Sequence, residues 1–114
     1  MVLEGNWEWQ HATDIHYDSA GRFMSTQAQR GAPGDYHLVI TRQTFQYFRG
    51  NGAADTPPMT YTHQSNAIAF ESHVRLTITA ITQHILVLHH LGETTTPTAG
   101  SLEGRTDTDA YYSR

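Results

Sequence analysis

The sequence predicts an all-β protein, an antiparallel up-and-down meander that closes into a small barrel of about 8 strands. Three observations favour this fold: β-branched and aromatic residues are abundant, apolar residues recur at alternate positions, and Gly, Pro, Asn and Asp separate the alternating segments. No segment shows a clear helical period of apolar residues. A chain of 114 residues is expected to form a single domain, 1–114.

The first strand is expected at residues 3–11, where Trp7 and Trp9 share one face. A tight turn is predicted at residues 18–21, because the sequence Asp-Ser-Ala-Gly is typical of turns. A long connection is expected over residues 24–35.

Two further strands are marked by alternation. In residues 36–41, Leu38 and Ile40 point to the same side, and residues 45–47 repeat the pattern. Residues 49–58 are predicted to form a loop because they contain Gly-Asn-Gly and a Pro-Pro pair.

The second half of the chain repeats this organisation, and strands are expected at residues 59–63, 67–71, 74–80 and 85–90. Apolar residues alternate with Arg and Thr in the third of these, so one face is expected to be buried and the other solvated. The fourth is apolar on both faces and is expected to be covered on both sides.

The C-terminal part is expected to contain a mobile loop at 92–109, which is rich in Thr and Gly, and a last short strand at Tyr111 and Tyr112. A meander of this length can close on itself, with an interior just wide enough for side chains or one small ligand. A two-sheet sandwich is the competing arrangement, and it is disfavoured because neighbouring strands are joined mostly by short connections.

The composition excludes several classes of function. The chain has no cysteine, which removes disulfides, thiolate metal sites and thiol nucleophiles. All seven basic residues are arginines, and they are scattered singly in a chain with eleven acidic residues, so no nucleic acid partner is expected. The longest apolar run, residues 85–88, is far shorter than the ~18 residues that a transmembrane segment needs.

Three pieces of sequence carry a family resemblance. They are residues 5–7 (Gly-Asn-Trp), residues 60–62 (Thr-Tyr-Thr) with Asn66 and Ile68, and residues 78–88 (ITAITQHILVL). The first is similar to the lipocalin Gly-x-Trp motif, and the others are similar to hairpins in the middle and near the end of that domain. On these pieces the chain resembles the lipocalin-like domains of small exported bacterial proteins, which are part of the wider calycin group.

The resemblance implies a barrel in which Trp7 packs across the closed end and Gly5 allows close approach of the chain, so that these two residues form a structural plug. It also implies export to the periplasm or the cell exterior. Residues 3–9 already have a strand pattern, so an export signal is expected to be absent or removed, and a cytoplasmic location stays open.

The interior of such a barrel is the candidate ligand site. Parity within each strand predicts ten inward-facing residues that contact a small hydrophobic ligand: Trp9, Tyr61, His63, Ile68, Phe70, Leu76, Ile78, Leu86, Leu88 and His90. The two histidines are expected near the mouth, as polar anchors. A plain packed core is the competing interpretation of the apolar members.

The eight histidines raise the question of a metal site, but none stands in a His-Glu-x-x-His or comparable frame. Adjacent His89 and His90 point to opposite faces of a strand and cannot share one ion as neighbours. No serine lies in a Gly-x-Ser-x-Gly turn. The sequence motifs therefore predict no metal, no cofactor and no catalytic residue.

Three functions stay open. The favoured one is non-enzymatic binding of a small apolar or amphiphilic molecule in the barrel. The second is an interaction or structural module of the cell envelope with a filled barrel, whose loops at 49–58 and 92–109 contact another protein. The third is a small barrel enzyme that uses an interior histidine and a carboxylate.

Overall fold

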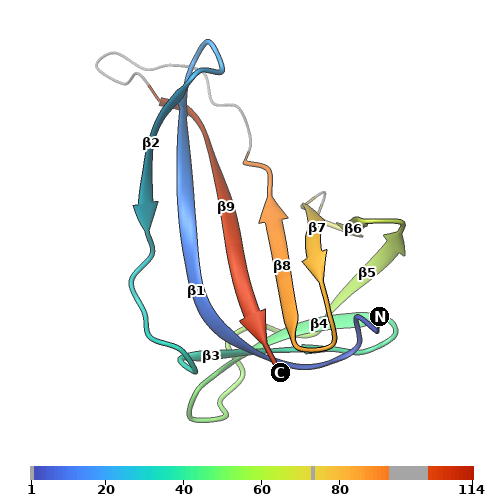
Figure 1. Cartoon of the computed structure of the whole chain (residues 1–114). Helices are drawn as coiled ribbons and strands as arrows, with labels where there is room; N and C mark the ends of the chain where they lie inside the picture. The colour runs from blue at the N-terminus through green and yellow to red at the C-terminus, as the bar shows by residue number, and fades with distance from the viewer. Residues whose placement is uncertain (1, 73, 93–102) are drawn as a thin grey trace.

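The computed structural model describes residues 2–72, 74–92 and 103–114, which form one antiparallel sheet of nine strands (Figure 1). The strands are β1 (Gly5–Asp18), β2 (Phe23–Ala28), β3 (Tyr36–Ile40), β4 (Thr44–Arg49), β5 (Met59–Gln64), β6 (Ala67–Phe70), β7 (Arg75–Ile81), β8 (Ile85–His90) and β9 (Glu103–Ser113). These residues include no helix, and so none that could cross a membrane. The all-β class is confirmed.

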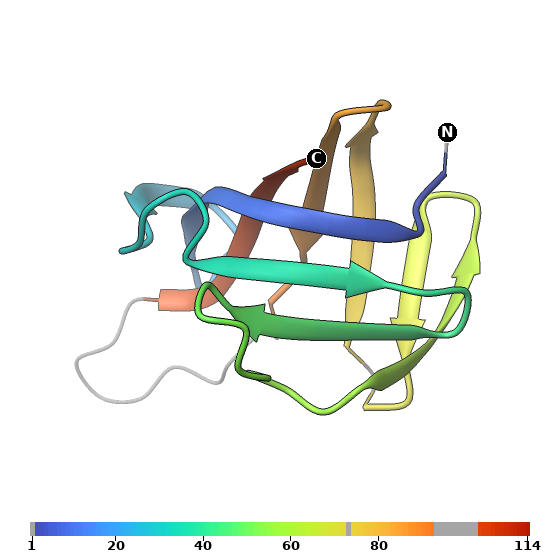
Figure 2. The same ribbon diagram turned by 90° about the horizontal axis from the view of Figure 1, so that it is seen from below.

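The sheet closes into a barrel because its first and last strands pair. β1 pairs with β3 on one side and β9 on the other, so that β1 and β3–β9 form an eight-stranded barrel. β2 is an extra strand that pairs only with β1. Figure 2 shows the first part of β1 beside β3 and β4. The predicted barrel is confirmed, and the sandwich is excluded.

β1 is longer than the sequence indicated. It was expected to end near His11 but continues to Asp18, because β2 and β9 pair with its second half on either side. The predicted turn at 18–21 is confirmed, since the Gly21 N–H donates to the Asp18 carbonyl at 3.0 Å. β2 follows at once and occupies the start of the expected long connection, 24–35.

The prediction of a mobile loop at 92–109 is wrong for residues 103–109, which belong to β9; residues 93–102 lie outside the described part of the chain. From Arg105 to Asp109, β9 alternates charged residues with threonine and has no large apolar side chain, but pairing with both β1 and β8 satisfies the hydrogen bonds of its backbone. Its small side chains, such as Thr108 and Ala110, face the interior, and its outward Asp109 pairs with His89 of β8.

The hydrophobic core fills the end of the barrel where the two chain termini meet (Figure 1). The ring of Phe45 makes edge contacts with Tyr61 and Phe70, at centroid distances of 4.8 and 5.2 Å. The largest fully buried side chains are Trp7, Phe45, Leu38, Ile40, Ile68 and Leu86.

Trp7 and Arg114 close this end of the barrel. The Trp7 indole donates from Nε1 to the Leu3 carbonyl at 2.9 Å, and the Arg114 guanidinium lies 3.9 Å over the Trp7 ring. Gly5 has a φ of +149°, a backbone conformation that L side chains rarely adopt, so this position favours glycine. The absence of a side chain also leaves room for Nη1 of Arg114, which would lie 2.8 Å from a Cβ there. Arg114 also donates to the carbonyls of Val2, Glu4 and Gln83.

Candidate functional site

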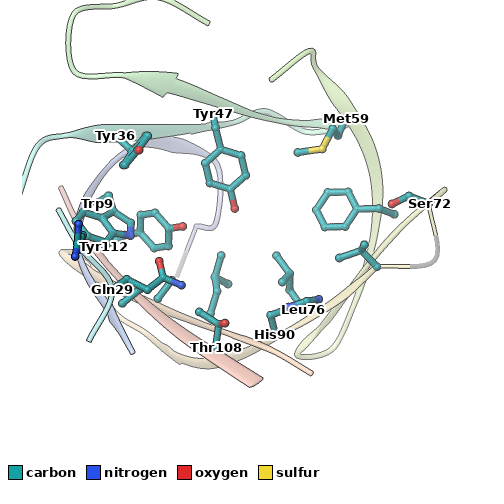
Figure 3. Close-up of a pocket in the computed structure, with 16 residues that line it drawn as sticks. Trp9, Gln29, Tyr36, Tyr47, Met59, Ser72, Leu76, His90, Thr108 and Tyr112 are labelled. Atoms are coloured by element: carbon teal, nitrogen blue, oxygen red, sulfur yellow. The ribbon is translucent and has the colours of Figure 1, made fainter. Parts of the chain in front are cut away.

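A cavity of about 500 Å³ lies inside the barrel beyond the core (Figure 3). Its volume is in the range of ~300–1,000 Å³ that is usual for small-molecule sites. It opens to solvent beside Tyr36 and Val74, which are 38 % and 40 % exposed. The residues that line it are Trp9, Ala12, Gln29, Arg30, Tyr36, Tyr47, Met59, Phe70, Ser72, Val74, Leu76, Leu88, His90, Thr108, Ala110 and Tyr112.

The wall formed by β8, β9 and β1 changes from apolar to polar along the strands. Strand register aligns three rows of inward residues across it, namely Leu86, Tyr112 and Trp9, then Leu88, Ala110 and Ala12, then His90, Thr108 and Asp14. The first two rows are apolar apart from the Tyr112 hydroxyl and the Trp9 N–H, and every residue of the third is polar. This gradient suits a molecule that is apolar at one end and polar at the other.

In the polar third row, Asp14 and Thr108 already form hydrogen bonds within the protein. Oδ1 of Asp14 accepts from Nε2 of Gln29 and from Oγ1 of Thr108, both at 2.8 Å. The His90 ring and the Arg30 guanidinium have no hydrogen-bond or ion-pair partner within the described residues. These two side chains are therefore available to a bound molecule.

Two phenols bring polar groups into the apolar part of the cavity. The hydroxyls of Tyr47 and Tyr112 both point into it (Figure 3). Burial raises the pKa of Tyr47 and raises that of Tyr112 well above the usual value; the neighbouring phenol adds to the rise at Tyr112 and opposes the rise at Tyr47. Both groups are consequently neutral at physiological pH.

The structure brings half of the predicted ligand-binding residues to the cavity. Those that line it are Trp9, Phe70, Leu76, Leu88 and His90. Four more face inward but lie in the packed core, namely Tyr61, Ile68, Ile78 and Leu86. For example, the Tyr61 hydroxyl donates to the Thr41 carbonyl at 2.7 Å and does not reach the cavity.

His63 is placed differently from the prediction. Its side chain is exposed, and its Nε2 lies 2.7 Å from the Ser65 carbonyl oxygen. β5 lines the cavity only at Met59, where it pairs with the start of β4, and then leads away from it. Of the two expected anchors, the structure brings only His90 to the cavity.

Several lining residues were missed, for three different reasons. Alternation could have found Tyr36, Tyr47 and Met59, which share parity with buried neighbours on their strands. Thr108 was missed because residues 92–109 were predicted to form a loop, and Ala110 was missed because it lies between that loop and the short strand expected at Tyr111 and Tyr112. Gln29 and Arg30 come from the connection after β2, and nothing in their local sequence marks them.

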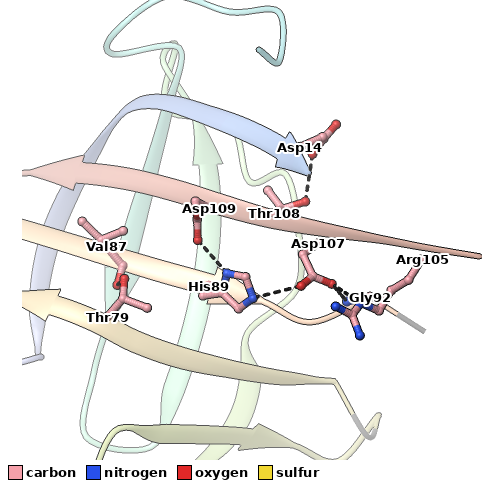
Figure 4. A network of polar contacts seen from close by, with 9 residues as sticks. All are labelled: Asp14, Thr79, Val87, His89, Gly92, Arg105, Asp107, Thr108 and Asp109. Atoms are coloured by element: carbon pink, nitrogen blue, oxygen red, sulfur yellow. Dashed lines mark hydrogen bonds and ion pairs between the residues drawn. The ribbon is translucent and has the colours of Figure 1, made fainter. Parts of the chain in front are cut away.

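A second group of polar residues lies outside the cavity and joins β8 to β9 (Figure 4). The His89 ring lies between two carboxylates, with Nδ1 2.6 Å from Asp109 and Nε2 3.2 Å from Asp107. Asp107 is 2 % exposed and also accepts from the Gly92 N–H at 3.0 Å. Nε of Arg105 lies 3.0 Å from Asp107 without hydrogen-bond geometry, so this contact is purely ionic.

This charged group has the character of a structural element, because its members already pair with one another. Among the described residues, no group of three or more His, Asp or Glu side chains is placed to hold a metal ion.

Comparisons with known protein families, with curated proteins and with solved structures find no match to this chain. The resemblance to lipocalin-like domains therefore stays a prediction at the level of the family. What is established is the architecture, a closed eight-stranded antiparallel barrel of a kind compatible with the calycin group.

Proposed function

We propose that this protein binds one small apolar or amphiphilic molecule inside the barrel and does not transform it. The observation that supports the proposal is the cavity of about 500 Å³, with aromatic and aliphatic walls and an opening to solvent. Burying the apolar part of a ligand against these walls is favourable by about 25 cal/mol per Å².

The two competing functions have less support. A barrel that serves only as an interaction module needs no interior space, whereas this barrel encloses a cavity beyond its core. An enzyme with an interior histidine and carboxylate would use His90 and Asp14. Strand register places Thr108 between these two residues, and the Asp14 carboxylate is already occupied by Thr108 and Gln29.

The proposal is tested by titrating the protein with N-phenyl-1-naphthylamine, an uncharged probe whose fluorescence rises in apolar surroundings. We expect saturable binding of one probe per chain. Ala110→Phe places a phenyl ring in the cavity and should weaken binding at least tenfold. Ala80→Phe adds the same ring at an exposed position on β7 and should leave binding unchanged.

Circular dichroism spectra would establish that both variants fold, and Leu76→Trp offers a second way to fill the same space. The proposal is wrong if the native protein shows no saturable binding, or if the folded cavity variants bind the probe as tightly as Ala80→Phe does.

A further inference from the structure

Tyr47 and Tyr112 lie at the level of the barrel core and not at the mouth. Strand register pairs Tyr112 with Leu86 and Tyr47 with Leu38, and both leucines are fully buried. Both hydroxyls nevertheless line the cavity and point into it (Figure 3). They are polar groups among mostly apolar neighbours, and β4 and β9 hold them there.

The two hydroxyls cannot satisfy each other completely. Each phenol carries one hydrogen that it can donate. Within the described residues neither hydroxyl has a hydrogen-bond partner outside the pair, and a bond between the two would use only one of their two hydrogens. At least one O–H is therefore free to donate to a molecule in the cavity, and a ligand that covers it without offering an acceptor leaves that donor unsatisfied.

We propose that the ligand carries a neutral hydrogen-bond acceptor, such as a ketone, ester or amide carbonyl, that accepts a hydrogen bond from the Tyr47–Tyr112 pair. This inference rests on the proposed function and specifies its ligand class. An acceptor meets the unused O–H, whereas a purely hydrocarbon ligand would leave that donor unsatisfied.

The surroundings of the pair favour a neutral acceptor over a carboxylate. Arg30 is the only Arg among the lining residues, and its side chain is exposed to solvent. A carboxylate placed beside Tyr47 and Tyr112 would lose its hydration among apolar walls without gaining a cation. The polar end of an amphiphilic ligand would instead lie toward His90 and Thr108.

Three naphthalenes of similar shape test the proposal by competition with N-phenyl-1-naphthylamine. They are 2-acetylnaphthalene, which has a carbonyl, 2-ethylnaphthalene, which lacks it, and 2-naphthoate, which is charged. Because a neutral hydrogen bond contributes about 0.5–1.5 kcal/mol net, the ketone should bind roughly two- to tenfold more tightly than the hydrocarbon. The carboxylate should bind more weakly than the ketone.

Phenylalanine variants then test whether the preference for the ketone depends on Tyr47 and Tyr112. Tyr47→Phe and Tyr112→Phe each leave one hydroxyl, now without its phenol partner, and should keep part of the preference for the ketone. The double variant Tyr47→Phe/Tyr112→Phe should bind ketone and hydrocarbon equally. Tyr111→Phe removes the hydroxyl of a tyrosine that does not line the cavity and should keep the full preference.

The outcomes separate this inference from the function on which it rests. Equal affinity for ketone and hydrocarbon in the native protein, or a preference that survives in the double variant, overturns the inference and leaves ligand binding intact. Tighter binding of the carboxylate also overturns it. Failure of the naphthylamine probe itself to bind overturns both.

Discussion

Replacement of Arg114 by methionine should destabilise the barrel by about 3 kcal/mol. Its guanidinium donates three hydrogen bonds of 2.8–2.9 Å to main-chain carbonyls. Each is assigned about 0.8 kcal/mol because the side chain is exposed and charge assistance is screened by solvent. The contact over Trp7, at 3.9 Å, adds roughly 0.5 kcal/mol.

The expected change in melting temperature follows from the size of the protein. An unfolding entropy of ~2.1 cal/mol/K per residue gives about 0.24 kcal/mol/K for this chain, so a loss of about 3 kcal/mol lowers the melting temperature by roughly 12 °C. Differential scanning calorimetry measures this change directly.

Arg75→Met is the matched control, because Arg75 is exposed and its side chain has no partner within the described residues. Arg114→Lys should recover only part of the loss, since an ammonium keeps the charge but cannot reach three carbonyls at once. If Arg114→Met melted within about 3 °C of Arg75→Met, the view that Arg114 closes this end of the barrel would be wrong.

Two further predictions concern buried polar groups. Burial raises the folded-state pKa of Tyr47 and Tyr112, so their contribution to stability is complete below the unfolded value of about 10 and is lost as pH rises through the folded-state values. The urea midpoint should therefore fall between about pH 9 and about pH 11, and it should fall less in Tyr47→Phe/Tyr112→Phe; identical slopes would contradict this. Asp107→Ala should cost about 2–3 kcal/mol in urea unfolding because it leaves Arg105 without its ion-pair partner and the Gly92 N–H without its acceptor. Asp35→Ala, at an exposed aspartate, is its comparison, and equal losses would refute the structural role of Asp107.

The fold could be predicted from the sequence wherever burial imposes alternation. Strands such as β3 and β7 bury one face, and their apolar residues recur at every second position. Apart from the short strand expected at Tyr111 and Tyr112, β9 gave no such signal, because threonines alternate with charged residues from Arg105 to Asp109. Its existence depends on two neighbouring strands, β1 and β8, which are distant in sequence.

The sequence predicted which side chains face the interior of the barrel, but not how far along the barrel each of them lies. Alternation correctly placed residues such as Leu88 and Ile78 inside the barrel, yet only the first lines the cavity. Depth depends on how far each strand is shifted against its neighbours, and local sequence carries little information about that shift. For the same reason parity alone suggested that His63 would reach the mouth.

The central claim is that a small molecule lies inside the barrel, and nuclear Overhauser contacts test it most directly. Protein with ¹³C-labelled methyl groups would be saturated with 2-acetylnaphthalene or N-phenyl-1-naphthylamine. We predict contacts from the ring protons of the ligand to the methyls of Met59, Leu76 and Leu88, which line the cavity. Contacts confined to exposed methyls outside it, such as those of Val2, Met24 and Ile85, would contradict the claim.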